Sequence, residues 1–112
     1  MPKNRSASQL TEAEYYVMLA LKAPNHGYAI MQSVEDLSEG TLRMGPATLY
    51  TVLQRLSDGE LIKQERRKKG EDPRRKIYDM TERGRAVLMN DVWRRCAMAQ
   101  HGANILNEME IL

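Results

Sequence analysis

The sequence predicts a mainly α-helical fold that carries one small β-hairpin and ends in a long helix. Three observations lead to this prediction. Apolar residues recur at helical spacing in three segments within residues 11–58. Residues 68–73 contain one glycine and one proline and separate two short arms that suit strands. Residues 82–112 contain no proline and can therefore form one uninterrupted helix.

The first two helices follow from cap signals and apolar stripes. A threonine followed three residues later by a glutamate predicts a capping box between Thr11 and Glu14 at the start of the first helix, which Pro24 ends. A second helix is expected over residues 26–38, with apolar residues at helical spacing. A turn and a short extended bridge, residues 38–44, then lead into the next helix, which makes a helix-turn-helix with a long turn.

The third helix organises the chain. Gly45 suits an N-cap and Pro46 suits the first helical position, where the missing N–H of proline is no loss. Its apolar face is formed by Leu49, Val52, Leu53 and Leu56. The opposite face is formed by Thr48, Tyr50, Thr51, Gln54, Arg55 and Asp58. These hydroxyl, amide and guanidinium groups suit phosphates and base edges, which indicates a recognition helix; the alternative is a plain solvated face.

Two details near the end of this helix are also predicted. Gly59 stands where a residue of left-handed conformation would end the helix. The guanidinium of Arg55 has two interpretations, because it either contacts DNA or pairs with a neighbouring acid such as Glu60.

The two arms around residues 68–73 predict a two-stranded hairpin with a basic tip, which must pack on the helices because a lone hairpin is marginal. Residues 63–76 hold eight Lys or Arg against three Asp or Glu, a local net charge of +5 in a chain of net charge +2. Three helices followed by a basic hairpin form a winged helix-turn-helix. We expect this domain over residues 1–80, with residues 1–9 as a flexible tail.

The final helix is expected over residues 82–112, with Thr81 as its N-cap. At ~1.5 Å per residue it would reach roughly 45 Å, more than the width of a small domain. Its apolar residues are Leu88, Met89, Val92, Trp93, Cys96, Met98, Ala99, Ala103 and Leu106. This stripe is wider than one contact needs, so a second copy of the chain is expected to cover it. Whether Gly102 kinks the helix stays open at this point.

Other features narrow the class of protein. The single cysteine, Cys96, excludes an internal disulfide and favours a cytoplasmic setting. Residues 1–9 lack the apolar segment of a signal peptide, and no apolar run approaches the ~20 residues that span a membrane. No cluster of His, Cys or acidic residues has metal-ligand spacing, and no glycine-rich phosphate loop is present. We therefore expect that the protein is not an enzyme and that it binds no cofactor, metal ion or membrane.

Four motifs keep a common order and spacing within residues 11–88. They are His26-Gly27-Tyr28, the string Thr48-Leu49-Tyr50 with Leu53, Arg55-Leu56, Gly59 and Leu61-Ile62, then Arg75-Lys76-Ile77-Tyr78, and Thr81-Glu82-Arg83-Gly84-Arg85. Together they resemble the PadR family of bacterial transcriptional regulators, and specifically its small members with a single C-terminal dimerisation helix. The chain departs from the family pattern at Thr51, where proline is common.

The resemblance implies a cytoplasmic homodimeric repressor that binds near-palindromic operators and releases them when a small, often aromatic molecule binds. In small members, a tryptophan on the C-terminal helix lines a pocket at the dimer interface, and Trp93 matches it by position. Trp93 and Met89, one turn earlier, are therefore the predicted site for a planar aromatic effector. The alternative is that Trp93 belongs to a dimer core without a cavity.

The predicted DNA contacts lie on the third helix and on the hairpin. They are Thr48, Tyr50, Thr51 and Gln54 on the helix, with Lys68, Lys69, Arg74, Arg75 and Lys76 on the hairpin. The hairpin is expected to supply affinity through phosphates, and the helix to supply register and base readout. The alternative function is a winged-helix protein–protein interaction module whose basic hairpin contacts an acidic partner without direct DNA binding.

Overall fold

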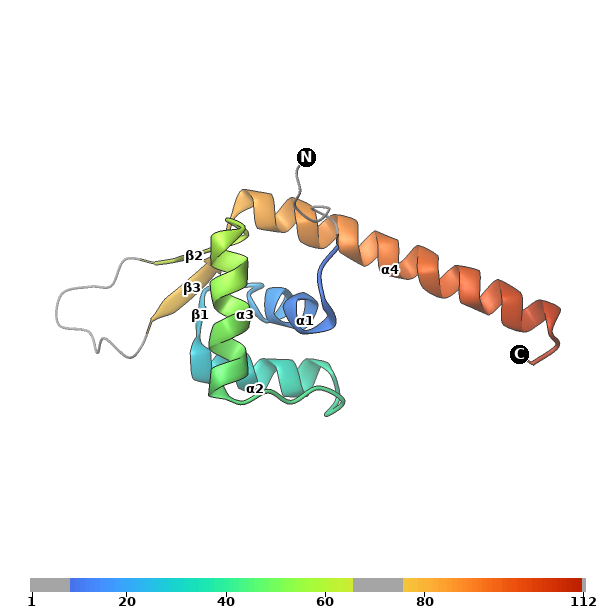
Figure 1. Ribbon diagram of the computed structural model, residues 1–112, viewed down its shortest axis with the longest axis horizontal. Helices are drawn as coiled ribbons and strands as arrows, with labels where there is room; N and C mark the ends of the chain where they lie inside the picture. Colours follow the sequence, from blue (N-terminus) through green and yellow to red (C-terminus); the bar gives the residue numbers. More distant parts are fainter. Residues whose placement is uncertain (1–8, 66–75, 112) are drawn as a thin grey trace.

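A computed structural model describes residues 9–65 and 76–111 of the chain. Three helices form a compact group, and a fourth, longer helix crosses it and extends beyond (Figure 1). In chain order the elements are α1 (Glu12–Ala20), β1 (Asn25–His26), α2 (Gly27–Leu37), α3 (Pro46–Asp58), β2 (Ile62–Gln64), β3 (Ile77–Met80) and α4 (Glu82–Glu108). Most of the predicted tail and the predicted hairpin tip lie outside the described residues.

The core lies between α1, α2 and α3. Val17 and Met18 enter it from α1, and Ile30 and Val34 enter it from α2. The predicted apolar face of α3 is confirmed, because its four members are all buried: Leu49, Val52, Leu53 and Leu56. Burial of each such side chain is worth about 1.5–3 kcal/mol, so this face fixes α3 against the other helices and turns its polar face outward.

The predicted starts of the first, third and fourth helices are confirmed. The Glu14 amide donates to Thr11 Oγ1 at 3.1 Å, and the Thr11 amide donates to Glu14 Oε1 at 2.9 Å, which completes the capping box. Gly45 and Pro46 open α3 as N-cap and first helical residue. Thr81 caps α4, since its Oγ1 accepts the Gly84 amide at 2.9 Å.

The end of α3 corrects one prediction. Gly59 has φ −83° and ψ 1°, so it is not left-handed. Glu60 is the left-handed residue instead, with φ 61°. The Leu61 amide donates to Leu56 O at 2.9 Å and the Glu60 amide donates to Ser57 O at 3.0 Å, which is the hydrogen-bond pattern of a Schellman motif. Glu60 therefore occupies the position that glycine fills with least strain.

The sheet has three strands, whereas two were predicted. Their order is β1-β3-β2 and all pairs are antiparallel; Asn25 lies opposite Tyr78, and Ile62 lies opposite Met80. His26 is accordingly not helical as predicted but extended, with φ −110° and ψ 165°, and it is the N-cap of α2. A strand of two residues is too short to show an alternating pattern, so β1 can be recognised only from its pairing with β3.

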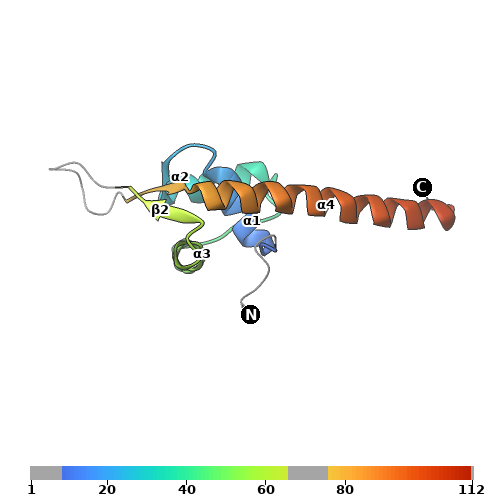
Figure 2. The same ribbon diagram turned by 90° about the horizontal axis from the view of Figure 1, so that it is seen from above.

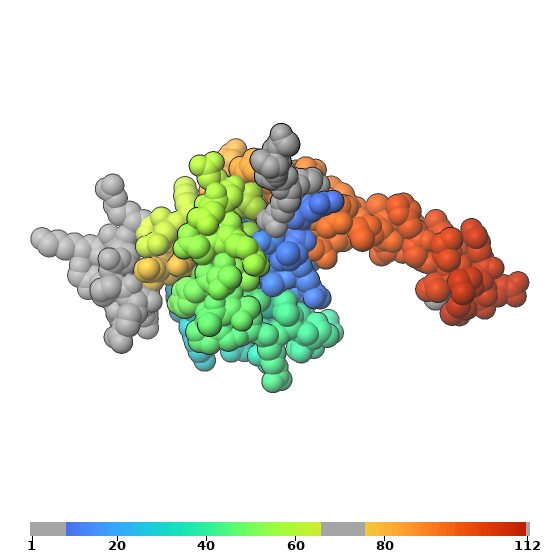
Figure 3. Space-filling model, in the orientation of Figure 1, coloured from blue at the N-terminus to red at the C-terminus, as the bar shows by residue number. Residues whose placement is uncertain are grey.

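Helix α4 runs through Gly102 without interruption over 27 residues, about 40 Å. Its first half packs on the domain, where Val87 and Asp91 are buried. Its second half projects past the other helices in both ribbon views (Figures 1 and 2) and stands apart from the body in the space-filling view (Figure 3). Exposed apolar side chains mark this helix and its end: Met89, Trp93, Met98, Ile105, Leu106, Met109 and Ile111. Within the described ranges, no helix is long and apolar enough to cross a membrane.

Candidate nucleic-acid interface

The polar face of α3 lies at the surface of the molecule. Thr48, Tyr50, Thr51 and Gln54 are all exposed, and α3 forms much of the near face in Figure 3. Two of these side chains hold local contacts. Thr51 Oγ1 donates to Ala47 O at 3.0 Å, and Gln54 Nε2 donates to Asp58 Oδ1 at 2.9 Å. Because both contacts are exposed, a bound phosphate or base edge can replace them at small cost.

A polar hollow of about 550 Å³ lies between α3 and the sheet. Its lining comprises Tyr50, Leu53, Gln54 and Ser57 of α3, Ile62, Lys63 and Gln64 of β2, and Lys76 and Tyr78 at β3. Three predicted DNA contacts, Tyr50, Gln54 and Lys76, are thus brought together here. The lysines at the two strands place positive charge beside the exposed face of α3, which suits a polyanion.

Sequence reasoning missed several members of this lining. Ser57, Lys63, Gln64 and Tyr78 were not among the predicted contacts, although Lys63 belongs to the basic segment. The signal lies in the pairing of β2 with β3, which places Gln64 opposite Tyr78. That register becomes visible only when both strands are known. Lys68, Lys69, Arg74 and Arg75 lie outside the described residues.

Two tyrosines meet at the edge of this hollow. Burial of Tyr78 raises its pKa, and the nearby Tyr50 raises it further. Gly27 makes room for Tyr50: a Cβ at this position would lie 2.7 Å from the Tyr50 hydroxyl oxygen. The glycine of the His26-Gly27-Tyr28 motif therefore positions a side chain of α3.

The structure answers the open question about Arg55. Its Nε lies 3.4 Å from Oε2 of Glu14 on α1, so Arg55 does pair with an acid, and that acid is Glu14 rather than the suggested Glu60. Glu60 begins the next segment in a left-handed conformation, and its carbonyl accepts from Thr81 Oγ1 at 2.7 Å. The Arg55 side chain remains about half exposed, whereas that of Glu14 is fully buried.

A second, apolar hollow of about 430 Å³ lies along the first half of α4. Trp93 and Met89, the predicted effector site, both border it, together with Lys22, Met80, Arg85, Leu88 and Val92. The Trp93 side chain is 64% exposed in the single chain. In the part of the chain that the structure describes, no group of three or more His, Cys, Asp or Glu could hold a metal ion.

A helix-turn-helix, an outward polar helix face, a flanking sheet that carries lysines and a long C-terminal helix define a winged helix-turn-helix protein of the transcription-factor class. The chain belongs to the PadR-like family of transcriptional regulators, whose family model matches residues 17–90. The predicted family and fold class are both confirmed. The family consists of regulators rather than enzymes.

Solved structures resemble the chain over most of its length. A PadR-like transcription factor from Bacteroides fragilis is 30% identical, with a TM-score of 0.61 over 80% of this chain and 87% of that one. A PadR family regulator from Eggerthella lenta is 26% identical, with a TM-score of 0.69 over 83% of this chain and 80% of that one. Bacillus subtilis PadR in complex with operator DNA is 20% identical, with a TM-score of 0.61 over 73% of this chain and 47% of that one, and shares the fold.

An uncharacterised protein of Lysinibacillus sphaericus is 33% identical over 70 residues. The match covers 62% of this chain and 64% of that relative's length.

Proposed function

We propose that the protein is a sequence-specific, cytoplasmic DNA-binding regulator that acts as a homodimeric repressor. The observation that carries the proposal is the exposed polar face of α3 beside a hollow that Lys63 and Lys76 flank. The complex of Bacillus subtilis PadR with operator DNA, which has the same fold, supports it. In this proposal residues 1–80 bind DNA and residues 81–112 join the two copies.

DNA binding is tested by selection of bound duplexes from a random pool. A two-fold dimer presents two copies of α3 to one face of the duplex, so we expect near-palindromic half-sites about 10 bp or a multiple apart. Affinity should fall steeply and linearly on a log–log plot against salt. A chain that retains no duplex at low salt would contradict the proposal and leave the protein–protein interaction module as the function.

Two sets of variants separate affinity from specificity. Replacement of Lys68 and Lys69 by Ala should weaken binding to all DNA sequences alike. It should also reduce the slope of log affinity against log salt by about one unit per lost phosphate contact. Replacement of Gln54 by Ala should change sequence preference more than affinity. An unchanged salt slope in the lysine variant would show that the hairpin does not contact phosphates.

The dimer is proposed from the exposed apolar side chains of α4. Met98 and Ile105 on α4, and Met109 at its C-cap, are each more than half exposed where the helix extends beyond its own domain. A contiguous exposed apolar stripe marks an interaction surface, and a second copy of the same helix offers a matching apolar partner. Sedimentation should show a dimer for the full chain at ~10 µM and a monomeric or poorly folded product for a chain cut after residue 84. A monomeric full chain would contradict the proposal.

The effector is proposed to be a small planar aromatic molecule that Trp93 and Met89 hold at the dimer interface. The apolar hollow that both side chains border supports it. Planar cationic dyes should quench Trp93 with micromolar saturation and compete with the operator. Anionic planar dyes belong in the same experiment, because Lys22 and Arg85 border the hollow. A dimer in which no dye quenches Trp93 would place Trp93 in a closed dimer core.

A further inference from the structure

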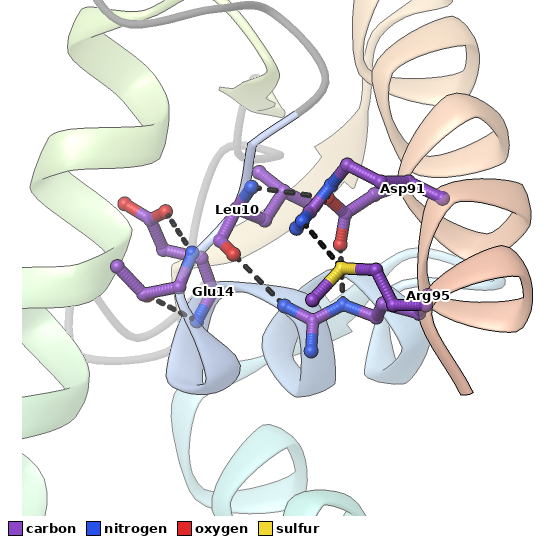
Figure 4. A network of polar contacts seen from close by, with 7 residues as sticks. Leu10, Glu14, Asp91 and Arg95 are labelled. Atoms are coloured by element: carbon purple, nitrogen blue, oxygen red, sulfur yellow. Dashed lines mark hydrogen bonds and ion pairs between the residues drawn. The ribbon is translucent and has the colours of Figure 1, made fainter. Parts of the chain in front are cut away.

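Two fully buried carboxylates, those of Glu14 and Asp91, meet the same short stretch of chain. Both side chains have 0% exposure. A buried charge costs several kcal/mol unless it is paired and hydrogen-bonded, so each must be held by specific partners. In Figure 4, Leu10 lies between Asp91 and Arg95 on the side of α4 and Glu14 on the side of α3.

On the side of α4, both backbone polar groups of Leu10 are held. Its amide donates to Asp91 Oδ1 at 3.2 Å, and its carbonyl accepts from Arg95 Nη2 at 2.8 Å. Arg95 Nε donates to Asp91 Oδ2 at 2.6 Å, and Arg94 Nη2 donates to Oδ1 at 2.9 Å. The Arg95 guanidinium also lies 4.3 Å from the centre of the Tyr15 ring, which ties it to α1.

On the side of α3, the next residue is held in the same way. The amide of Thr11 donates to Glu14 Oε1 at 2.9 Å, and the other oxygen of that carboxylate, Oε2, pairs with Arg55 Nε at 3.4 Å. Two successive backbone amides, those of Leu10 and Thr11, therefore donate to two buried carboxylates. The first is Asp91 on α4, and the second is Glu14, which also forms an ion pair with Arg55 on α3. The Leu10 side chain is itself buried, so this segment cannot shift without its surroundings.

Helix α4 is also hydrogen-bonded to the rest of the domain near its first turn, so a tilt about that turn displaces residues further along the helix. Near its first turn, Thr81 donates its amide to Leu61 O at 3.0 Å, and Arg83 Nε donates to Gly59 O at 3.0 Å. Asp91 lies about 14 Å further along the helix at ~1.5 Å per residue. A tilt of about 5° at the first turn would displace Asp91 by ~1 Å, which is enough to break or remake its hydrogen bond to Leu10.

We propose that residues 10–14 form a joint that transmits the position of α4 to the recognition helix α3, with Glu14 and Arg55 as its positioning residues. The inference rests on the proposed DNA-binding function and deepens it. Dimer formation or effector binding that changes the tilt of α4 displaces Leu10 through its hydrogen bonds to Asp91 and Arg95. Thr11 and the Glu14 carboxylate, which is hydrogen-bonded to the Thr11 amide, are displaced with it. Arg55 then moves with α3 relative to the duplex.

The test uses the reciprocity of coupled sites: if α4 biases α3, DNA bound at α3 must also bias α4. Trp93 is the only tryptophan of the chain and reports on α4. It borders the apolar hollow, which shares no lining residue with the hollow beside α3. Titration of the full chain with the selected duplex should therefore change the Trp93 emission of the unmodified protein.

The decisive variant is Glu14→Gln. Glutamine still serves as the capping partner of Thr11, but it removes the charge that holds Arg55. We expect duplex affinity, followed by polarisation of a labelled duplex, to fall about tenfold and the Trp93 response at saturation to fall by at least half. The control is Glu35→Gln, which removes an exposed ion pair, Arg43 Nε to Glu35 Oε2 at 3.3 Å, away from the joint. It should leave the Trp93 response unchanged.

Each remaining outcome decides the question. A full Trp93 response in Glu14→Gln at saturation would overturn the joint, as would an unmodified protein that binds the duplex without any change at Trp93. If no form binds any duplex, the proposed function fails and the inference fails with it. If Glu14→Gln does not fold, the double variant Glu14→Gln/Arg55→Gln, which removes both partners of the 3.4 Å ion pair, takes its place. Its Trp93 response at saturation should fall by at least half, and a full response would overturn the joint.

Discussion

Gly84, in the first turn of α4, lies against the backbone of Leu61, which follows α3 in the chain. We expect the substitution Gly84→Ala to push the first turn of α4 away from this segment. A Cβ at this position would lie 2.1 Å from Leu61 O and 2.9 Å from Met80 Cγ. Even a close C···O contact needs about 3.3 Å, so the first turn of α4 must move by about 1 Å. This close approach explains why the Thr81-Glu82-Arg83-Gly84-Arg85 motif has glycine at its fourth position, where any side chain would clash with Leu61 O.

The cost follows from the contacts at that turn. The shift disrupts the hydrogen bonds from the Thr81 amide to Leu61 O at 3.0 Å and from Thr81 Oγ1 to Glu60 O at 2.7 Å. Each is worth about 1 kcal/mol, and the overpacking adds about 1–3 kcal/mol. The better helix propensity of alanine returns about 1 kcal/mol. We therefore expect a loss of about 2–4 kcal/mol in the free energy of unfolding.

Thermal unfolding followed by circular dichroism measures this loss. For a chain of this size we expect Tm to fall by roughly 8–16 °C. The matched control is Gly102→Ala in the same helix, where an added Cβ meets nothing within 4 Å in the single chain. It should stabilise the protein by about 0.5–1 kcal/mol through propensity alone. A Gly84→Ala protein as stable as the unmodified one, or equal shifts in both variants, would refute the steric argument.

Further predictions concern stability. Glu60→Gly should raise the free energy of unfolding by about 0.5–1 kcal/mol in urea titration, because glycine adopts the left-handed conformation without strain; a loss would show that the Glu60 side chain contributes more than its backbone costs. Burial alone would raise the pKa of Asp91, but hydrogen bonds from Arg95, Arg94 and the Leu10 amide hold it below its ordinary value. A depressed folded-state pKa stabilises the protein above the unfolded-state pKa, and this contribution is lost as pH falls below about 4. Asp91→Asn should therefore lose about 2 kcal/mol at pH 7 and show a flatter dependence of stability on pH between 5 and 2; an unchanged acid limb would contradict this origin of the acid sensitivity.

Local chemistry explains why much of the fold could be predicted. The buried face of α3 follows from apolar residues at spacings of three and four, and the caps at Thr11 and Thr81 need only residues within one turn. These signals do not depend on the rest of the chain. The exposed face of α3 followed in turn, because the opposite side of a half-buried helix must meet water.

The parts that were missed depend on distant partners. Strand β1 exists because Asn25 and His26 pair with Tyr78 and Ile77, more than fifty positions away. The lining of the polar hollow depends on the same sheet, since the register of β2 on β3 decides which side chains face α3. No local pattern in two residues can distinguish such a strand from the end of a loop.

Glu14 shows why a correct local prediction can still be incomplete. Its place in the capping box was predicted correctly, and a capping glutamate is ordinarily a surface residue. A carboxylate has two oxygens, however, and the capping box uses only Oε1. When the fold buries Glu14, the charge on the other oxygen needs a cation nearby, and among the described contacts Arg55 provides it at 3.4 Å. The same side chain thus obeys a local rule that the sequence shows and a tertiary requirement that appears only once α1 and α3 are packed together.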